Sequence, residues 1–409
     1  MNITIIVPFL PYPLNSGGAQ AVFNMIDKIR STDNITLVCI QSRLIKQRYV
    51  AELKEKWPNV NIVMYSYTKQ LADLKFLKDK AIRALNLLYR KNDKRFVVER
   101  ALRPYGVHFD NNLKHFINKT LQSSKPDVIQ VEFFPLLHII DLLPQNIKHI
   151  FVHHELRFVR NERLLRNIGL TDDEKKYGHM IKCDEIAYLN RYDRVVTLTD
   201  TDKRILQEHG VTTEIKVSPA AISTPIKPYC KWQNKLLFLG GYSHKPNVEG
   251  LEWFVEKVAP KIEWAEFPNV EFHLVGGGWP DKIVEKYQND LKIPFIYEGF
   301  VPKLEDAATG SIMIVPILTG SGMRMKILEA AALSIPFITT SVGVEGLDFT
   351  DKDSCIVEDE ADKWVTSLSE LMTDETLRHK LSDKAQRIFK EKYSVEALAN
   401  KRMQVYKFQ

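Results

Sequence analysis

Short apolar runs recur along the whole chain and alternate with amphipathic stretches, and this alternation constrains the fold more than any other feature. Each run is continuously apolar, which is typical of parallel strands that are buried on both faces. The runs cover residues 3–9, 35–40, 61–67, 128–133, 149–154 and 194–199 in the first half, and 236–241, 270–278, 295–300, 312–317 and 337–340 in the second. Helical periodicity separates them, so the sequence predicts an α/β fold of doubly wound units.

One stretch, residues 218–235, interrupts this alternation because it holds three prolines and no clear periodicity. Such a stretch is typical of a linker, and a chain of 409 residues is long enough for about two or three domains. We therefore expect a first α/β domain over residues 1–217 and a second over residues 236–392. The helical pattern of residues 393–409 predicts a separate short helix.

Cysteine usage and the apolar runs bear on the cellular compartment. The cysteines are scattered and none falls in a C-x-x-C spacing, which argues against a disulfide framework and a zinc site. The first residues lack the basic segment and the small-residue cleavage site of a signal peptide, and no apolar run approaches the roughly 20 residues that span a bilayer. These features predict a cytoplasmic protein.

The segment 316–340 carries the strongest candidate for a binding site, since it reads as strand, glycine loop, helix and strand. Gly320 and Gly322 let the backbone approach a ligand closely, and the start of the following helix offers amides to an anion. The helix dipole disfavours cations in the first turn, so a bound diphosphate would explain Arg324 and Lys326 there. Glu329 lies on nearly the same face as Lys326 and would accept hydrogen bonds from a ribose diol. The alternative is a surface turn whose charged residues are solvated.

This segment resembles the retaining family-4 glycosyltransferases of the GT-B fold, in which a Glu-x7-Glu element precedes a strand of the type PVI. Glu329 corresponds to the second glutamate, and PFITT (336–340) corresponds to the strand. Ser321 stands where the family has its first glutamate, so the chain follows the variant G-x-G-x-R-x-K-x-x-E, which is associated with polysaccharide-building branches. The family's first glutamate contacts sugar hydroxyls, and backbone amides near Ser321 would replace it here.

The resemblance covers most of the chain and implies two Rossmann-like domains that face each other across a cleft, with the last helix crossing back to the N-terminal domain. It also implies donor-binding positions outside the glycine loop, which are Gly17 and Gly18 near the diphosphate, Gly241 and Lys245 at the opening of the second domain, and Phe300 and Val301 at the nucleobase. Many family members place an Arg and a Lys where this chain has His244 and Lys245. The diphosphate would therefore be held mainly by Arg324 and Lys326.

A His-His-Glu run ends one of the predicted first-domain strands, and ligands bind beyond the carboxyl ends of strands in open α/β sheets. The family often has a histidine close to the reacting centre here. The resemblance thus implies that His154 or His153 orients the donor or acceptor sugar, and that Glu155 accepts a hydrogen bond from the acceptor hydroxyl. Adjacent strand residues point to opposite faces, so one histidine would enter the cleft. Metal binding and plain packing are the alternatives.

Basic residues concentrate in residues 69–103, where Leu71, Leu74, Leu77, Leu85 and Leu88 form an apolar face. A basic amphipathic helix is typical of contact with an anionic membrane surface, which would place the protein peripherally on the inner face of the cell membrane. A core-packed helix with a solvated basic face is the alternative. Nucleic-acid binding is disfavoured, because no aromatic platforms are interleaved with these basic residues.

The expected reaction moves a sugar of the hexosyl type from a nucleoside diphosphate donor to a hydroxyl of a saccharide or lipid-linked saccharide, with retention implied by the resemblance alone. The donor is a substrate, and no cofactor is expected. No metal is expected either, since the D-x-D sequence at Asp200 lies at a strand-to-helix junction, where Asp and Thr cap helices. The alternatives are a sugar-nucleotide 2-epimerase of the same fold and a non-catalytic protein that binds nucleotide-sugars.

Overall fold

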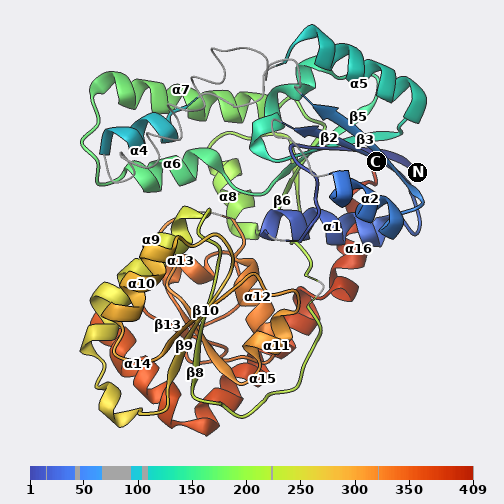
Figure 1. Ribbon diagram of the computed structural model, residues 1–409. Coiled ribbons are helices and arrows are strands. Elements are labelled where there is room, and N and C mark those ends of the chain that lie inside the picture. Colours follow the sequence, from blue (N-terminus) through green and yellow to red (C-terminus); the bar gives the residue numbers. More distant parts are fainter. Residues whose placement is uncertain are drawn as a thin grey trace. The chain divides into compact units, whose positions relative to one another are not determined.

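The computed structural model describes residues 1–14, 16–41, 47–66, 94–103, 109–222, 224–320 and 322–408. The described chain forms two compact units, the first made of Met1–Pro219 and Asn400–Gln409 and the second of Ala220–Ala399. Figure 1 shows both units and labels most of their helices and several of their strands. The proline-containing stretch is hydrogen-bonded to the second unit, since Lys227 N donates to Ala332 O (3.1 Å) and Gln233 N to Gly310 O (2.8 Å).

The first unit is built on a seven-stranded sheet with the strand order β3-β2-β1-β4-β5-β6-β7, in which all neighbours are parallel. The strands are β1 (Asn2–Val7), β2 (Asn34–Gln41), β3 (Val60–Ser66), β4 (Val128–Glu132), β5 (Lys148–His153), β6 (Arg194–Thr197) and β7 (Glu214–Val217). β4 is buried along its whole length and β5 along all but its first residue. The continuous apolar runs of the sequence thus form central strands.

Helices follow most of these strands, and polar side chains set where several of them begin. The helices of the first unit are α1 (Gly17–Ile29), α2 (Gln47–Lys56), α4 (Lys94–Ala101), α5 (Asn111–Ser124), η2 (Phe134–Leu142, a 3-10 helix), α6 (Arg157–Leu165), α7 (Asp172–Leu189) and α8 (Asp200–Glu208). Ser16 caps α1, because its side chain accepts a hydrogen bond from Ala19 N (3.2 Å). Thr199 caps α8 in the same way, through Asp202 N (3.0 Å).

The second unit is built on a six-stranded sheet with the order β10-β9-β8-β11-β12-β13, again with parallel neighbours. The strands are β8 (Lys235–Leu239), β9 (Glu271–Val275), β10 (Phe295–Gly299), β11 (Ser311–Val315), β12 (Phe337–Thr339) and β13 (Ile356–Val357). The helices are α9 (Lys245–Trp253), α10 (Asp281–Asp290), α11 (Leu304–Ala308), α12 (Met325–Ala332), α13 (Ser341–Val344), α14 (Ala361–Thr373), α15 (Glu375–Lys392) and α16 (Val395–Val405), with the short turns η3 (Phe254–Val258), η4 (Ala259–Lys261) and η5 (Trp264–Glu266). α16 begins in the second unit, and its last residues belong to the first.

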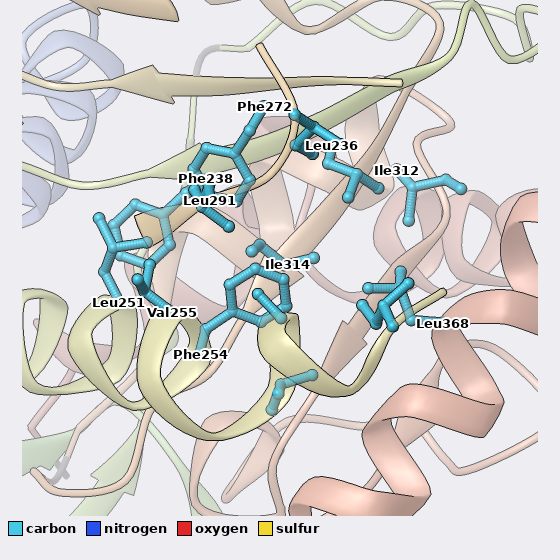
Figure 2. Packing of buried hydrophobic residues seen from close by; sticks show 14 of the residues in the cluster. Leu236, Phe238, Leu251, Phe254, Val255, Phe272, Leu291, Ile312, Ile314 and Leu368 are labelled. Carbon is cyan, nitrogen blue, oxygen red and sulfur yellow. The ribbon is translucent and has the colours of Figure 1, made fainter. Parts of the chain in front are cut away.

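Alternate strand residues form separate cores on the two faces of the second sheet. Leu236 and Phe238 of β8 pack with residues of α9, α10 and α14, and Figure 2 shows part of this core. Leu237, which lies between them, packs on the other face with residues of α11, α12 and α15. Successive side chains of a strand point to opposite faces. A strand that is covered on both sides is therefore apolar at most positions, as β8 is from Leu236 to Leu239.

The connection order reverses between β1 and β4 in the first sheet and between β8 and β11 in the second. In doubly wound sheets, ligands bind in the crevice outside the carboxyl ends of the strands at this reversal. The residues proposed from the sequence end β5, as His153 does, or follow β1, β5, β8, β10 or β11. They therefore lie at the carboxyl edges of the two sheets, and the prediction of two doubly wound α/β domains is confirmed.

The basic segment 69–103 is described only from residue 94 onward. That part contains α4, whose apolar residues pack with residues of α6 and α7 in a small core. Arg95 of α4 pairs with Glu174 of α7 (2.7 Å). The described end is thus a core-packed helix with a basic outer face, and the membrane prediction for residues 69–93 lies outside the described residues. In the part of the chain that the structure describes, no helix is both long and apolar enough to cross a membrane.

Candidate functional site

Glycines let three loops approach one another at the carboxyl edge of the second sheet. Gly276, which follows β9, has a φ of +131°, and a Cβ there would lie 2.5 Å from the carbonyl carbon of Gly240, which follows β8. Gly276 N also donates to the carbonyl oxygen of Gly299, the last residue of β10 (2.7 Å). A Cβ on Gly241 would lie 3.2 Å from Gly277 O. A side chain at Gly276 would push the loops apart, so this backbone contact fixes the edge on which the polar residues stand.

Arg324 is the N-cap residue of α12 and lies one position before the first helical turn. It is 8% exposed, and its Nη1 donates to Gly322 O. Gly320 has a φ of +115°, and a Cβ there would lie 3.6 Å from Arg324 Nη2. The guanidinium is therefore held against the glycine loop, beside the amides that begin α12, where a phosphate could accept from both.

Lys326, in the first turn of α12, reaches the helix that follows β8. Its Nζ donates to Asn247 Oδ1 at 2.8 Å and lies 5.0 Å from the centre of the Phe238 ring. Burial lowers the pKa of Lys326 to about 7; the charge of Glu329 opposes this fall and that of Arg324 adds to it. An anionic ligand would favour the charged form of this amine strongly, because the opposite charge offsets its loss of water.

Two polar residues of α9 hold the loops after β8 and β11 together. Asn247 is 5% exposed, and its Nδ2 donates to Gly241 O (3.0 Å). Glu249 pairs with Lys245 Nζ (2.9 Å) and accepts a hydrogen bond from Thr319 Oγ1 (2.7 Å). Lys245 is thus tied to the glycine loop through Glu249. Asn247 and Glu249 were not predicted from the sequence, although polar residues in the first turns of a helix that follows a glycine pair were a usable signal.

The remaining second-unit candidates border this region. Glu329 of α12 is 7% exposed and its charge acts on Lys326. Ser321 lies outside the described residues. Phe300, after β10, is 58% exposed, and Val301 is half-buried against the core beneath α11 and α12. The loop after β10 therefore presents a flat aromatic ring to solvent, beside the glycine turn that follows β9.

Gly17 and Gly18 begin α1 in the first unit, and Gly18 faces the end of β4. A Cβ on Gly18 would lie 3.2 Å from Cζ of Phe133 and 3.6 Å from Cζ of Phe9. Phe133 has a φ of +69°, which is unusual for a bulky residue. The close approach of this ring to the start of α1 favours glycine at position 18.

His153, the last residue of β5, has a side chain with no exposed surface. Its Nε2 is 2.8 Å from Glu185 Oε1. The Glu185 carboxylate also accepts from the backbone N of Arg157 and of Phe158 (3.0 and 3.1 Å), so it caps the start of α6. A fully buried side chain cannot touch a substrate, and we therefore assign His153 to packing and not to catalysis.

His154 retains some exposed surface, since its side chain is 11% exposed. Its Nε2 lies 2.5 Å from Glu132 Oε2 at the end of β4. Its ring stacks on Phe133, with the centroids 3.8 Å apart and the planes at 9°. Glu155, the next residue, pairs with Arg160 Nη1 (3.0 Å) and is partly exposed. A carboxylate and a ring thus hold the imidazole from two sides.

The proposed residues form two groups, one in each unit. The second unit brings together the cations Arg324 and Lys326 with the start of α12, which is a combination suited to a diphosphate. The first unit brings together Gly18 and His154 through Phe133. Glu132 and Phe133 were missed by the sequence analysis. Across the described ranges, no group of three or more His, Cys, Asp or Glu is arranged to hold a metal ion.

Comparisons with known proteins bear mainly on the second unit. Residues 233–374 match the family model described as Glycosyl transferases group 1, and this range contains all of the second-unit candidates. A protein from Klebsiella pneumoniae, described as an uncharacterized 44.6 kDa protein in cps region, is 27% identical over 121 residues. That match covers 27% of this chain and 30% of the relative, so the chain matches less than a third of the relative's length.

Solved structures resemble the whole chain. A TarM variant from S. aureus, in complex with fondaparinux, alpha-GlcNAc-glycerol and UDP, has a TM-score of 0.68 at 12% identity, covering 100% of both chains. Sucrose-phosphate synthase from Thermosynechococcus elongatus has a TM-score of 0.68 at 12% identity, covering 99% of this chain and 98% of that one. HepE from Anabaena, in complex with UDP and glucose, has a TM-score of 0.66 at 10% identity, covering 98% of each.

Identities this low establish the fold alone, and the fold they share is that of the GT-B glycosyltransferases. The family match in the second unit is independent of that likeness, since it rests on sequence. The chain therefore has the two-domain GT-B fold, and residues 233–374 carry the sequence pattern of the group 1 glycosyl transferases.

Proposed function

We propose that the protein is a glycosyltransferase that moves a sugar from a nucleoside diphosphate donor to a hydroxyl of a saccharide or lipid-linked saccharide, with retention. The observation that carries this proposal is the placement of Arg324 and Lys326 at the start of α12, on the carboxyl edge of the second sheet. The bound UDP of the TarM and HepE structures supports the donor class. The relative from a cps region supports a role in polysaccharide assembly.

The proposed chemistry rests on charge stabilisation. As the glycosidic bond to the diphosphate breaks, negative charge grows on the leaving oxygens, and preorganised cations and amides stabilise that charge. In this proposal Arg324 and Lys326 are the cations, the first residues of α12 provide the amides, and no metal ion takes part. In the front-face route implied by the family resemblance, the leaving phosphate takes the acceptor proton, while Glu329 holds the ribose diol and His154 orients the sugar. We place the reaction in the cytoplasm, at the inner membrane face if residues 69–103 bind lipid.

A thermal-shift screen of UDP-, GDP- and ADP-sugars tests donor binding first, because a ligand at 100 times its Kd stabilises a protein by about 2.7 kcal/mol. Release of nucleoside diphosphate is then measured with saccharide acceptors, with and without a chelator. Arg324→Ala should lose turnover, whereas Arg387→Ala, which removes an exposed arginine of the same unit, should not. The absence of a shift with every donor would refute the proposal.

The two alternatives give different products in the same assay. A 2-epimerase changes the sugar of the donor without any acceptor, and a non-catalytic binding protein shows a thermal shift without turnover over any acceptor. Acceptor-dependent release of the nucleoside diphosphate separates a transferase from both.

A further inference from the structure

A chain of buried polar side chains runs from His154 to the last helix within the first unit. Glu132 is 1% exposed and Gln130 is fully buried, and both lie on the same face of β4 because they are two residues apart. Gln130 Nε2 donates to Glu132 Oε1, and Glu132 Oε2 lies 2.5 Å from His154 Nε2. Polar side chains inside a central strand cost free energy unless they are hydrogen-bonded. The hydrogen bonds among Gln130, Glu132 and His154 therefore offset the cost of burying these side chains.

Arg402 of α16 brings a permanent positive charge to this chain. Its Nη2 donates to Gln130 Oε1 (3.0 Å) and lies 3.8 Å from Glu132 Oε1. A buried carboxylate is strongly destabilised when it lacks a charged or hydrogen-bonding partner. The guanidinium therefore offsets the burial of the Glu132 carboxylate beside Oε1, while Oε2 faces Nε2 of His154.

Tyr406, one turn after Arg402, holds the same amide. Its hydroxyl donates to Gln130 Oε1 at 2.7 Å. Burial raises the pKa of Tyr406 above its ordinary value, so the hydroxyl stays a donor. With two donors on Gln130 Oε1, the amide nitrogen must point at Glu132. The orientation of one side chain thus determines that of the next, from α16 to β4.

We propose that Arg402 and Glu132 are positioning residues for His154, so that docking of the last turns of α16 sets the orientation and tautomer of this imidazole. The hydrogen bond at one ring nitrogen decides which nitrogen carries the proton. Glu132 Oε2 accepts a hydrogen bond from Nε2 of His154, so the proton of the neutral ring is on Nε2 and the lone pair is on Nδ1. The stack on Phe133 then fixes the ring plane. This role for His154 in turnover rests on the proposed sugar transfer.

Kinetics of matched arginine variants test the proposal. Arg402→Met should lower kcat about 10- to 100-fold while the KM for the donor stays within about twofold, because a misplaced group costs turnover more than binding. Arg402→Lys should restore part of kcat. The control is Arg191→Met, since Arg191 belongs to the same unit and its ion pair is with Asp141 (2.6 Å), away from α16. It should leave kcat within twofold. Wild-type kcat in folded Arg402→Met would overturn the proposal.

A second readout does not depend on activity. Nitrogen-15 NMR of histidine-labelled protein reports the tautomer of each neutral ring, and the signal missing in His154→Gln identifies His154. Wild type should show the proton on Nε2, and Glu132→Leu should show a mixture of both tautomers. An unchanged tautomer in Glu132→Leu would overturn the proposal. A tautomer that responds, in a protein that turns over no donor, would refute the transferase function and leave the positioning network standing.

Discussion

Lys326 donates a hydrogen bond to Asn247 across 2.8 Å, and this contact joins the helix after β11 to the helix after β8. The two strands flank the reversal point of the second sheet. A buried amine at this place costs stability, since burial lowers the pKa of Lys326 to about 7. A residue that lowers the stability of the free protein and faces a proposed anion site is expected to serve ligand binding. Its substitution should therefore change stability and donor affinity in opposite directions.

Lys326→Met should stabilise the protein and weaken donor binding. The folded-state pKa lies below that of the unfolded chain, which is about 10.4, so the unfolded chain binds more protons between about pH 7 and pH 10. The penalty of the charged lysine is therefore full below pH 7 and fades as the pH rises toward 10. We expect calorimetry to show a rise in melting temperature of about 2–4 °C at pH 6.5, for a net gain near 1 kcal/mol, that shrinks at pH 9.5.

The control for this variant is Lys257→Met, which removes an exposed lysine of the same unit and should leave the melting temperature unchanged at every pH. A Lys326→Met protein that melts below wild type at all pH values would contradict the buried-amine account. The expected net gain near 1 kcal/mol already allows for the hydrogen bond that Asn247 Oδ1 loses in the variant, which costs about 1 kcal/mol.

Donor binding should take up a proton at pH 8. There Lys326 is mostly neutral in the free protein, and a diphosphate beside it restores the charge because an opposite charge raises the pKa of an amine. Titration calorimetry in Tris and in HEPES, whose ionisation enthalpies differ, should give an uptake approaching about one proton. Lys326→Arg keeps the charge but does not titrate, so it should bind with little uptake. Equal uptake in both proteins would exclude Lys326 as the group.

The proposed contact between Glu329 and the ribose can be tested by measuring donor affinity. Glu329→Ala should weaken donor binding roughly 5- to 150-fold, because the buried diol loses its acceptor at a cost of about 1–3 kcal/mol. Glu329→Gln keeps an acceptor oxygen and should lose less. A donor with a 2′-deoxyribose sharpens the test, since wild type should lose affinity for it and Glu329→Ala should not. Equal losses in both proteins would move Glu329 away from the ribose.

The fold was predictable because most strands are covered on both faces and are therefore continuously apolar. β7 was not predicted, because it lies at the sheet edge and its sequence EIKV begins with an exposed, a buried and an exposed residue, so it forms no continuous apolar run. β13 escaped because it has only two residues, Ile356–Val357. A search for unbroken apolar runs finds central strands and misses short or half-exposed ones.

The candidate site could be inferred from the sequence where its parts lie within one strand–loop–helix unit. The segment from Gly320 to Glu329 carries its glycines, cations and carboxylate at spacings that can be interpreted locally. Gln130 and Glu132 were visible as polar residues inside an apolar run, but their partner Arg402 stands 272 positions beyond Gln130. The choice between His153 and His154 likewise required Glu185 and Glu132, which come from other elements.

Gly18→Ala should impair turnover through Phe133. A Cβ at position 18 would lie 3.2 Å from the Phe133 ring, which is closer than ordinary contact, so the ring must shift by a few tenths of an ångström. That ring stacks on His154 with the centroids 3.8 Å apart, and the shift passes to the imidazole. We expect kcat to fall about tenfold or more, with the affinity for the donor little changed.

The matched control is Gly178→Ala, in the middle of α7. There the new Cβ would meet Leu102 Cδ2 at 3.6 Å, which is ordinary contact, and alanine in a helix interior should add about 0.5–1 kcal/mol of stability. Its kcat should equal that of wild type. In a Phe133→Leu background the ring is gone, so Gly18→Ala should cost nothing further if its effect runs through that ring. A tenfold loss that persists in the double variant, or a loss of donor affinity in place of kcat, would instead assign Gly18 to direct contact with the donor.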